Sequence, residues 1–158
     1  MENAPDEFHT PSGYKAQNQE KLTESMEDYL EMICRFSQSR GYVRVHELAE
    51  RLHVSPSSAS KMAANLKEAG LVDFKKYGLI QPSPSGKKIG AYLLYRHRVI
   101  MDFFQLLNTG RDLRQVEQIE HYLEETTVRH LEILTQIFNE NPSLLSLYQK
   151  RSGQADSR

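Results

Sequence analysis

Apolar residues recur every three or four positions along most of the chain, which is the spacing of amphipathic helices. The first such stretch runs from Thr23 to Ser37, and its apolar stripe comprises Met26, Tyr29, Leu30, Ile33 and Phe36. A second short helix is expected over 45–53. A third begins after Ser55, a candidate N-cap followed by Pro56, and ends near Gly70. The first half of the chain therefore predicts three successive helices.

The pattern then changes to short apolar runs before it returns to helical spacing. The segment "LVDFKKYGLIQP" predicts two strands, 71–75 and 79–82, joined by a tight turn at Tyr77 and Gly78. Further helices follow, which we expect over 85–107, 113–125, 127–139 and 142–149. No internal repeat interrupts this order.

Two short helices separated by a turn and followed by a hairpin are typical of a winged helix-turn-helix. We therefore expect a mainly α protein, with a winged helix-turn-helix DNA-binding domain over 22–84 and an all-helical domain over 85–150. Residues 1–21 are polar and show no period, so we expect a flexible N-terminal arm. A flexible tail is expected over 151–158.

Composition excludes several classes of protein. Apolar residues make up 39% of the 158 residues and charged residues 26%, as in soluble globular domains. No apolar run approaches the roughly 20 residues that span a bilayer. The first residues lack the hydrophobic core of a signal peptide, so we expect a cytoplasmic protein with no membrane partner. The single cysteine, Cys34, excludes an internal disulfide and is expected in the core.

The charge is divided unevenly along the chain. Residues 43–98 contain ten Lys or Arg against four Asp or Glu, a balance of +6, although the whole chain carries only −1. The rest of the chain therefore carries −7. The basic segment indicates a polyanion as partner, and the acidic remainder indicates cations.

Candidate DNA-contacting residues follow from the helix-turn-helix pattern, in which the second helix enters the major groove by its N-terminal end. The small polar and basic residues at that end are Ser55, Ser57, Ser58, Ser60 and Lys61. Lys75 and Lys76 of the hairpin are placed to neutralise phosphates. The serines alone are equally consistent with helix capping. Together with the hairpin and the basic balance, they favour double-stranded DNA as a partner.

The acidic half contains side chains that can bind metals. In "VEQIEHYLEE", residues 116–125, Glu117, Glu120 and His121 share one face of the expected helix. Such charged faces are most often simply solvated. Asp28 and Glu31 also lie three apart and off the apolar stripe of the first helix. His97 lies within the long helix, where a hydrogen-bonded histidine at a helix contact is the simpler interpretation.

Four segments, "SMEDYLEMI", "VSPSSASKM", "SGKKIGAYLLYRHRVI" and "VEQIEHYL", closely resemble the diphtheria-toxin-repressor (DtxR) family, and within it the manganese transport regulator (MntR) branch. The resemblance covers about residues 22–140. It implies a winged-helix DNA-binding domain, a helical metal-binding and dimerisation domain, and a divalent-metal site where the two meet. The ligands of the manganese branch fall on Asp28, Glu31, His97, Glu117, Glu120 and His121.

The residue types at two of these positions bear on the choice of metal. Iron-sensing members of the family are expected to have methionine in place of Asp28 and cysteine in place of Glu117. Carboxylate and imidazole ligands suit Mn²⁺, whereas sulfur ligands favour softer metals. The four carboxylates can also bridge and neutralise two cations, so we expect two Mn²⁺ ions per subunit.

The resemblance implies a homodimeric, Mn²⁺-activated transcriptional repressor that controls manganese uptake genes and is neither an enzyme nor dependent on an organic cofactor. Dimerisation is expected to rest on the helices after residue 85, whose candidate core or interface residues are Leu93, Leu94, Ile100, Phe103, Phe104 and Leu107. One alternative is a winged-helix regulator that responds to iron or to an organic ligand. Another is a di-metal carboxylate enzyme. The enzyme is disfavoured because helical bundles of that class use paired Glu-x-x-His motifs, whereas Glu117 and His121 are four apart.

Overall fold

The computed structural model describes residues 22–107 and 113–155. The predicted N-terminal arm, 1–21, and residues 156–158 lie outside the described residues. The elements, in chain order, are α2 (Glu24–Ser37), β1 (Val43–Arg44), α3 (Val45–Arg51), α4 (Pro56–Glu68), β2 (Val72–Lys75), η1 (Lys76–Gly78), β3 (Leu79–Pro82), α5 (Pro84–Leu106), α6 (Leu113–Ile119), η2 (Glu120–Tyr122), α7 (Glu125–Glu140) and α8 (Pro142–Ala155). The mainly α winged helix-turn-helix predicted from the sequence is thereby confirmed.

The predicted helix starts are fixed by capping side chains. Thr23 caps α2, where its hydroxyl accepts a hydrogen bond from the backbone N–H of Met26 at 3.2 Å. Ser55 caps α4 in the same way through the N–H of Ser58, and Pro56 follows at the first helical position, as predicted.

Two predicted boundaries are wrong, and one strand was not predicted. The helix expected over 113–125 ends at Ile119 and is followed by the 3-10 helix η2, because the chain turns there before α7 begins. The last helix continues to Ala155 instead of ending at residue 149. The two-residue strand β1 was not expected, because so short a segment leaves no alternating pattern.

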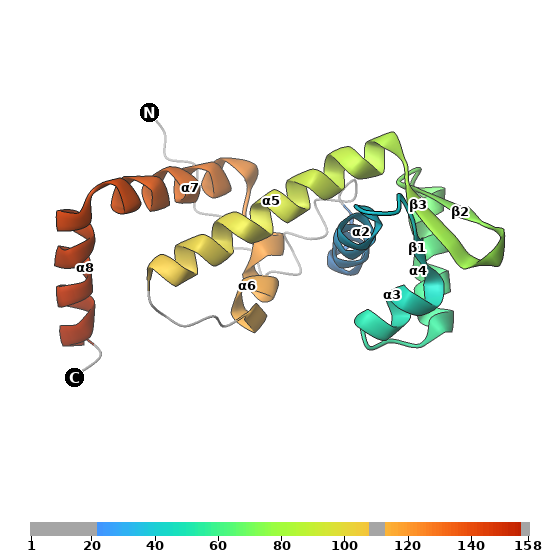
Figure 1. Ribbon diagram of the computed structural model, residues 1–158, viewed down its shortest axis with the longest axis horizontal. Coiled ribbons are helices and arrows are strands. Elements are labelled where there is room, and N and C mark those ends of the chain that lie inside the picture. The colour runs from blue at the N-terminus through green and yellow to red at the C-terminus, as the bar shows by residue number, and fades with distance from the viewer. Residues whose placement is uncertain (1–21, 108–112, 156–158) are drawn as a thin grey trace, which may run out of the picture.

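The sheet is small and antiparallel, with strand order β1-β3-β2. Ile80 of β3 pairs with Val43 on one side and with Phe74 on the other. Tyr77 and Gly78, at the tip of the β2–β3 hairpin, both have positive φ, at 66° and 69°. Hairpin turns of this kind match the right-handed twist of the flanking strands. The hairpin projects as a wing at the end of the molecule that also carries α3 and α4 (Figure 1).

One hydrophobic core joins α2, α3, α4 and the sheet. Its fully buried side chains include Leu30, Ile33, Leu48, Leu66 and Ile80. Because α2 and α4 bury residues in the same close-packed core, a shift of one helix would strain the packing of the other. Cys34 belongs to this core as predicted, and burial, followed by the charge of Glu31, raises the pKa of its thiol to about 11.

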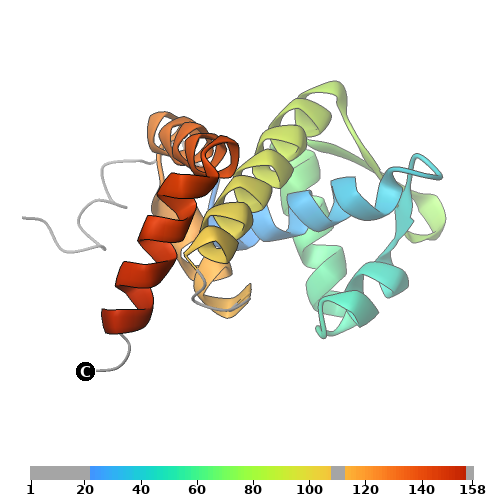
Figure 2. The same cartoon turned by 60° about the vertical axis from the view of Figure 1, so that its left-hand side comes forward.

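The long helix α5 extends from the sheet to the other end of the molecule, where α7 and α8 lie (Figures 1 and 2). Its first half crosses α2 at very close range. A Cβ atom on Gly90 would overlap the Sγ atom of Cys34, so only glycine allows this approach. Beyond the crossing, α6 and η2 pack against α5. Among the described residues, no helix combines the length and the apolar character that a membrane span requires.

Candidate metal centre and DNA-contacting surface

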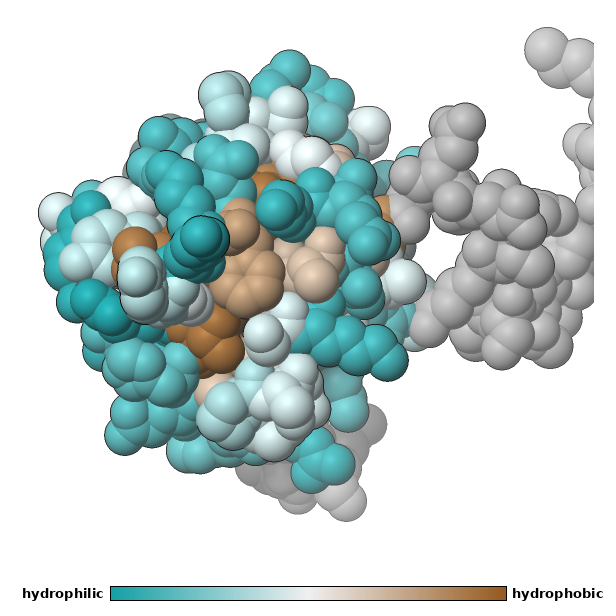
Figure 3. All heavy atoms as spheres, turned by 90° about the vertical axis from the view of Figure 1, so that its right-hand side faces the viewer, coloured by the Kyte–Doolittle hydropathy of each residue, from teal (hydrophilic) through white to brown (hydrophobic). Residues whose placement is uncertain are grey.

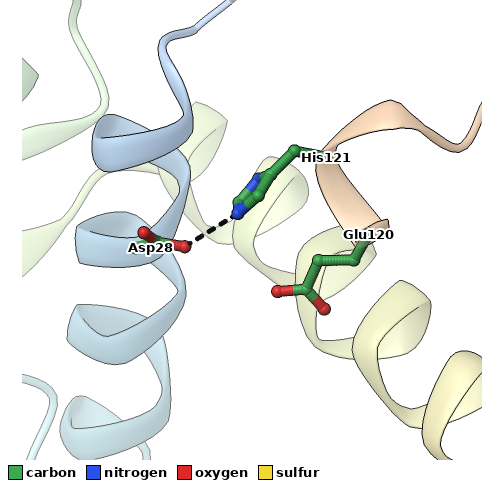
Figure 4. Close-up of side chains that lie close together, drawn as sticks. All are labelled: Asp28, Glu120 and His121. Atoms are coloured by element: carbon green, nitrogen blue, oxygen red, sulfur yellow. Dashed lines mark ion pairs between the residues drawn. The ribbon is translucent and has the colours of Figure 1, made fainter. Parts of the chain in front are cut away.

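Three elements that are far apart in the sequence meet at the candidate metal centre. Asp28 and Glu31 lie on α2, His97 lies on α5, and Glu120 and His121 lie on η2. Figure 4 shows the imidazole of His121 facing Asp28 across the space between η2 and α2, with Glu120 beside it.

The side chains form two groups that share one carboxylate. His121 Nε2 lies 3.2 Å from Asp28 Oδ1. His97 Nδ1 lies 2.9 Å from Glu120 Oε2. One group comprises Asp28, Glu120 and His121 and the other Glu31, His97 and Glu120, and in each the ligand atoms lie within 4.8 Å of one another. Ligand atoms on opposite sides of a divalent cation lie about 4 to 5 Å apart. The spacing within each group is therefore suited to one divalent cation.

Burial places like charges close together in this centre. Glu31 is only 7% exposed and Glu120 only 2%. Burial raises the pKa of Glu31, and the charge of Glu120 raises it further. The hydrogen bond to Glu120 raises the pKa of His97. Hydrogen bonds to Asp28 and to Glu27 raise the pKa of His121 to about 9. A divalent cation would relieve the repulsion between the carboxylates and would displace one proton from His121.

Glu117 does not join either group. It lies exposed on α6, while its neighbour Val116 is buried. The expectation that Glu117, Glu120 and His121 share one helix face is wrong, because α6 ends at Ile119 and the last two residues lie on η2. The structure thus brings together five of the six side chains predicted as ligands.

Two further residues at the centre were not predicted. Glu27 Oε2 lies 2.8 Å from His121 Nδ1 and accepts a hydrogen bond from Arg96 Nη2 at 2.8 Å. Arg96 is 4% exposed. Its position in the apolar segment "LLYRHRVI" was the available signal, because it falls three residues after Leu93 on the buried face of α5.

The predicted DNA-contacting residues lie at the surface of the winged-helix end. Ser55 caps α4, and its hydroxyl is hydrogen-bonded to those of Ser57 at 2.9 Å and Ser58 at 2.8 Å. Ser57, Ser58 and the nearby Lys61 are exposed, and Ser60 is partly buried. Capping is therefore the observed role of Ser55, while Ser57, Ser58 and Lys61 remain accessible to a partner.

The wing carries the remaining candidates. Lys75 and Lys76 are exposed, and Lys75 Nζ donates to Gln81 Oε1 at 3.2 Å. Tyr77, which was not predicted as a contact, is 90% exposed at the tip. The face at this end of the molecule is mostly hydrophilic around a small hydrophobic area (Figure 3). The exposed Lys75 and Lys76 supply positive charge of the kind that a phosphate backbone attracts.

Comparison with known proteins identifies both halves of the chain. Residues 21–79 match the family described as "Iron dependent repressor, N-terminal DNA binding domain". Residues 83–144 match "Iron dependent repressor, metal binding and dimerisation domain". The HTH-type transcriptional regulator MntR of Geobacillus kaustophilus is 37% identical over 139 residues, which are 85% of this chain and 99% of that protein. MntR of Bacillus subtilis is 36% identical over 121 residues, or 75% and 85% of the two chains.

Solved structures show the same relationship. A manganese-dependent transcriptional repressor in complex with manganese matches with 29% identity and a TM-score of 0.61, over 70% of this chain and 52% of that one. The manganese regulator SloR matches with 25% identity and a TM-score of 0.61, over 73% and 55%. The chain thus spans about half the length of these two proteins. It belongs to the iron-dependent repressor family of transcriptional regulators, which is the diphtheria-toxin-repressor family indicated by its motifs, and it is similar there to the MntR regulators.

Proposed function

We propose that this protein is an Mn²⁺-activated transcriptional repressor that binds operator DNA as a homodimer and controls manganese uptake genes. The observation that carries the proposal is the convergence of carboxylates and imidazoles from α2, α5 and η2 at one partly buried centre. The names of the relatives, MntR regulators and a manganese-dependent repressor, support the choice of metal. The proposal places the protein in the cytoplasm and assigns it no organic cofactor and no catalytic role.

The donor atoms at the centre favour Mn²⁺. In the described part of the chain, both ligand groups offer only carboxylate oxygen and imidazole nitrogen. Cys34 is not available as a sulfur ligand, because its thiol is buried, has a raised pKa and donates to the carbonyl of Gly86. Hard oxygen ligands suit Mn²⁺ better than they suit softer metals. Since Glu120 belongs to both groups, we propose two ions per subunit, with the Glu120 carboxylate available to each group.

The mechanism links the metal centre to the recognition helix α4. A bound divalent cation supplies positive charge and coordination bonds to oxygen and nitrogen atoms. Asp28 with the two η2 ligands, and Glu31 with His97 and Glu120, would hold such cations and would keep α2 against η2 and α5. The other side of α2 packs in the core with α4. Fixing α2 therefore fixes the orientation of α4, so that a dimer presents its two recognition helices about one DNA turn apart.

The domain boundary is part of the proposal. The DNA-binding domain comprises residues 22–84, and the metal-binding and dimerisation domain comprises 85–150. The start of α5 at Pro84 lies at this boundary. Asp28 and Glu31 would then belong to the first domain, and the remaining ligands to the second.

Fluorescence anisotropy of labelled DNA tests the function. A binding site selected from random duplexes in the presence of Mn²⁺ serves as the operator. We expect binding that Mn²⁺ strengthens and a chelator reverses. A regulator of the organic-ligand type would bind regardless of metal. An iron sensor would respond more strongly to Fe²⁺ than to Mn²⁺ at equal free concentration under anaerobic conditions. A di-metal enzyme would not bind the DNA with or without metal.

A further inference from the structure

Glu27 lies beside the candidate ligands without belonging to either group. Its Oε2 atom is 2.8 Å from Arg96 Nη2 and 2.8 Å from His121 Nδ1. The other ring nitrogen of His121, Nε2, lies 3.2 Å from Asp28 Oδ1. The imidazole therefore presents one nitrogen to Glu27 and the other to a candidate metal ligand.

The contacts of Nδ1 decide which nitrogen keeps its proton when a cation displaces the other. Arg96 Nη2 is also near Nδ1, at 3.4 Å. A guanidinium can only donate hydrogen bonds, whereas a carboxylate can only accept them. The carboxylate is closer, so Nδ1–H donates to Glu27, and the guanidinium donates to Glu27 as well. Nε2 is then the nitrogen whose lone pair can bind a cation next to Asp28.

Arg96 holds Glu27 in this position. The guanidinium is buried, and its Nε atom has no hydrogen-bond partner among the described residues. Glu27 is the carboxylate that compensates its charge, at 2.8 Å. Because a buried charge without a partner is costly, the pair keeps Glu27 on the Nδ1 side of the ring.

We propose that Glu27, held by Arg96, is a positioning residue of the metal centre. It keeps His121 protonated at Nδ1 and turns Nε2 toward Asp28. This inference rests on the proposed metal site. Carboxylates that orient metal-binding histidines in this way typically account for 10- to 100-fold in metal affinity. The arrangement also joins α2, α5 and η2 through one hydrogen-bonded chain of side chains.

Calorimetric titration of the full chain with Mn²⁺ measures the contribution of Glu27. We expect Glu27→Ala to weaken binding about 10- to 100-fold. Glu27→Gln should weaken it less, because the amide oxygen still accepts from Nδ1–H although it cannot pair with the charge of Arg96. Arg96→Lys should also weaken it. The matched controls are Glu68→Gln, an exposed carboxylate on α4, and Arg98→Lys, an exposed arginine on α5, and both should bind Mn²⁺ like wild type.

Nitrogen NMR of the imidazoles separates positioning from a purely structural role. With Zn²⁺ as a diamagnetic probe, the wild-type spectrum should show His121 protonated at Nδ1 and metal-bound at Nε2. In Glu27→Ala this single state should be lost. If Glu27→Ala does not fold, the nearly isosteric Glu27→Gln carries the test, with a smaller shift in the same direction.

The outcomes distinguish this inference from the proposed function. Wild-type protein that binds no Mn²⁺ would overturn both. Wild type that binds while the Glu27 variants bind within twofold of it would overturn the inference alone. Weakened Mn²⁺ binding with the His121 nitrogen states unchanged would also overturn it, because Glu27 would then act only on stability.

Discussion

Glu120 is the side chain shared by both groups of candidate ligands, and it is almost fully buried. We therefore predict that Glu120→Ala weakens Mn²⁺ binding more than any other single ligand substitution. The loss should exceed roughly 100-fold, which is the upper range for residues that orient a ligand without binding the metal. Glu117→Ala should have a smaller effect, since Glu117 lies outside both groups. Calorimetry on both variants measures the difference. A larger loss in Glu117→Ala than in Glu120→Ala would show that Glu120 does not have this central place.

His121 makes metal binding depend on pH. In the metal-free protein its pKa is raised to about 9, so at neutral pH a cation must displace a proton from the ring. We predict that Mn²⁺ affinity rises about tenfold per pH unit for each proton displaced and levels off near pH 9. Anaerobic titrations at several pH values between about 6.5 and 8.5 would measure the slope. If the affinity did not change with pH, metal binding would not displace a proton from His121.

The raised pKa of His121 has the opposite effect on the stability of the metal-free protein, which falls as the pH rises. A histidine with a raised pKa contributes stability that is fully present below its unfolded pKa of about 6.5 and is lost as the pH rises through about 9. The thermal midpoint of the metal-free protein should therefore fall over this window while Mn²⁺ affinity rises. A thermal midpoint that falls while Mn²⁺ affinity rises would show that protons compete with the metal for His121. General destabilisation of the fold would not raise the affinity.

At the residue scale, the sequence predicts ligand types better than it predicts their surroundings. The resemblance to the manganese branch identified five side chains that the fold brings together, whereas helical spacing alone was equally typical of a solvated face. The sequence pattern could not reveal that His121 Nδ1 faces Glu27 and not Asp28. These two carboxylates are adjacent on one helix and differ only in the direction in which their side chains point. The pattern also placed Glu117 with Glu120, because nothing local shows where α6 ends.

The crossing of α2 and α5 is the element-scale feature on which the metal centre depends. A methyl group on Gly90 would overlap Cys34, and His97 lies two helical turns further along α5. We predict that Gly90→Ala destabilises the protein by about 1 to 3 kcal/mol and weakens Mn²⁺ binding, because α5 is pushed away from Glu31. Denaturant unfolding and calorimetry measure the two effects.

Gly153 provides the matched control for this substitution. It lies in α8 with open space where a Cβ would stand. Gly153→Ala should therefore be neutral or stabilising by about 0.5 to 1 kcal/mol, with Mn²⁺ affinity unchanged. Wild-type stability and metal affinity in Gly90→Ala would contradict the close crossing.

The wing makes a separate prediction about DNA. Lys75 and Lys76 are exposed near its tip, so replacing either with Ala should weaken operator and random DNA alike. Each lost phosphate contact should reduce the slope of log K against log salt by about 0.9. Lys150→Ala, on α8 far from the wing, serves as the control (Figure 1). Unchanged affinity and salt slope in both wing variants would mean that the hairpin does not contact DNA.

Most elements were predicted within one or two residues because Pro, Gly and serine caps mark their ends. The exception at 113–125 has a tertiary cause. Ile119 and Leu123 continue the helical spacing, but Glu120 is buried in the centre and the chain turns into η2. The end of α8 was missed because its last turns are polar and carry no apolar period.

Across the whole molecule, the apolar surface indicates where a second subunit is expected. Leu93 and Ile100, proposed as core or interface, are buried within the chain itself. Five of the eight large apolar side chains that are exposed among the described residues lie on α7 and α8, namely Ile133, Leu134, Ile137, Leu144 and Leu147. The helices after residue 85 thus remain the expected dimer contact, and the wing and α4 lie at the opposite end of the molecule (Figure 1).

We propose that the metal centre and the DNA surface share one conformational equilibrium through α2. A thermodynamic cycle tests it most directly: operator affinity is measured with Mn²⁺ and with chelator, and Mn²⁺ affinity is measured with and without operator. Linkage requires both ratios to be equal, and typical couplings of 1–3 kcal/mol correspond to about 5- to 150-fold. We predict that operator DNA tightens Mn²⁺ binding by the same factor, of this size, by which Mn²⁺ tightens DNA binding. Mn²⁺ affinity that is unchanged by operator, together with DNA affinity that is unchanged by chelation, would contradict the account.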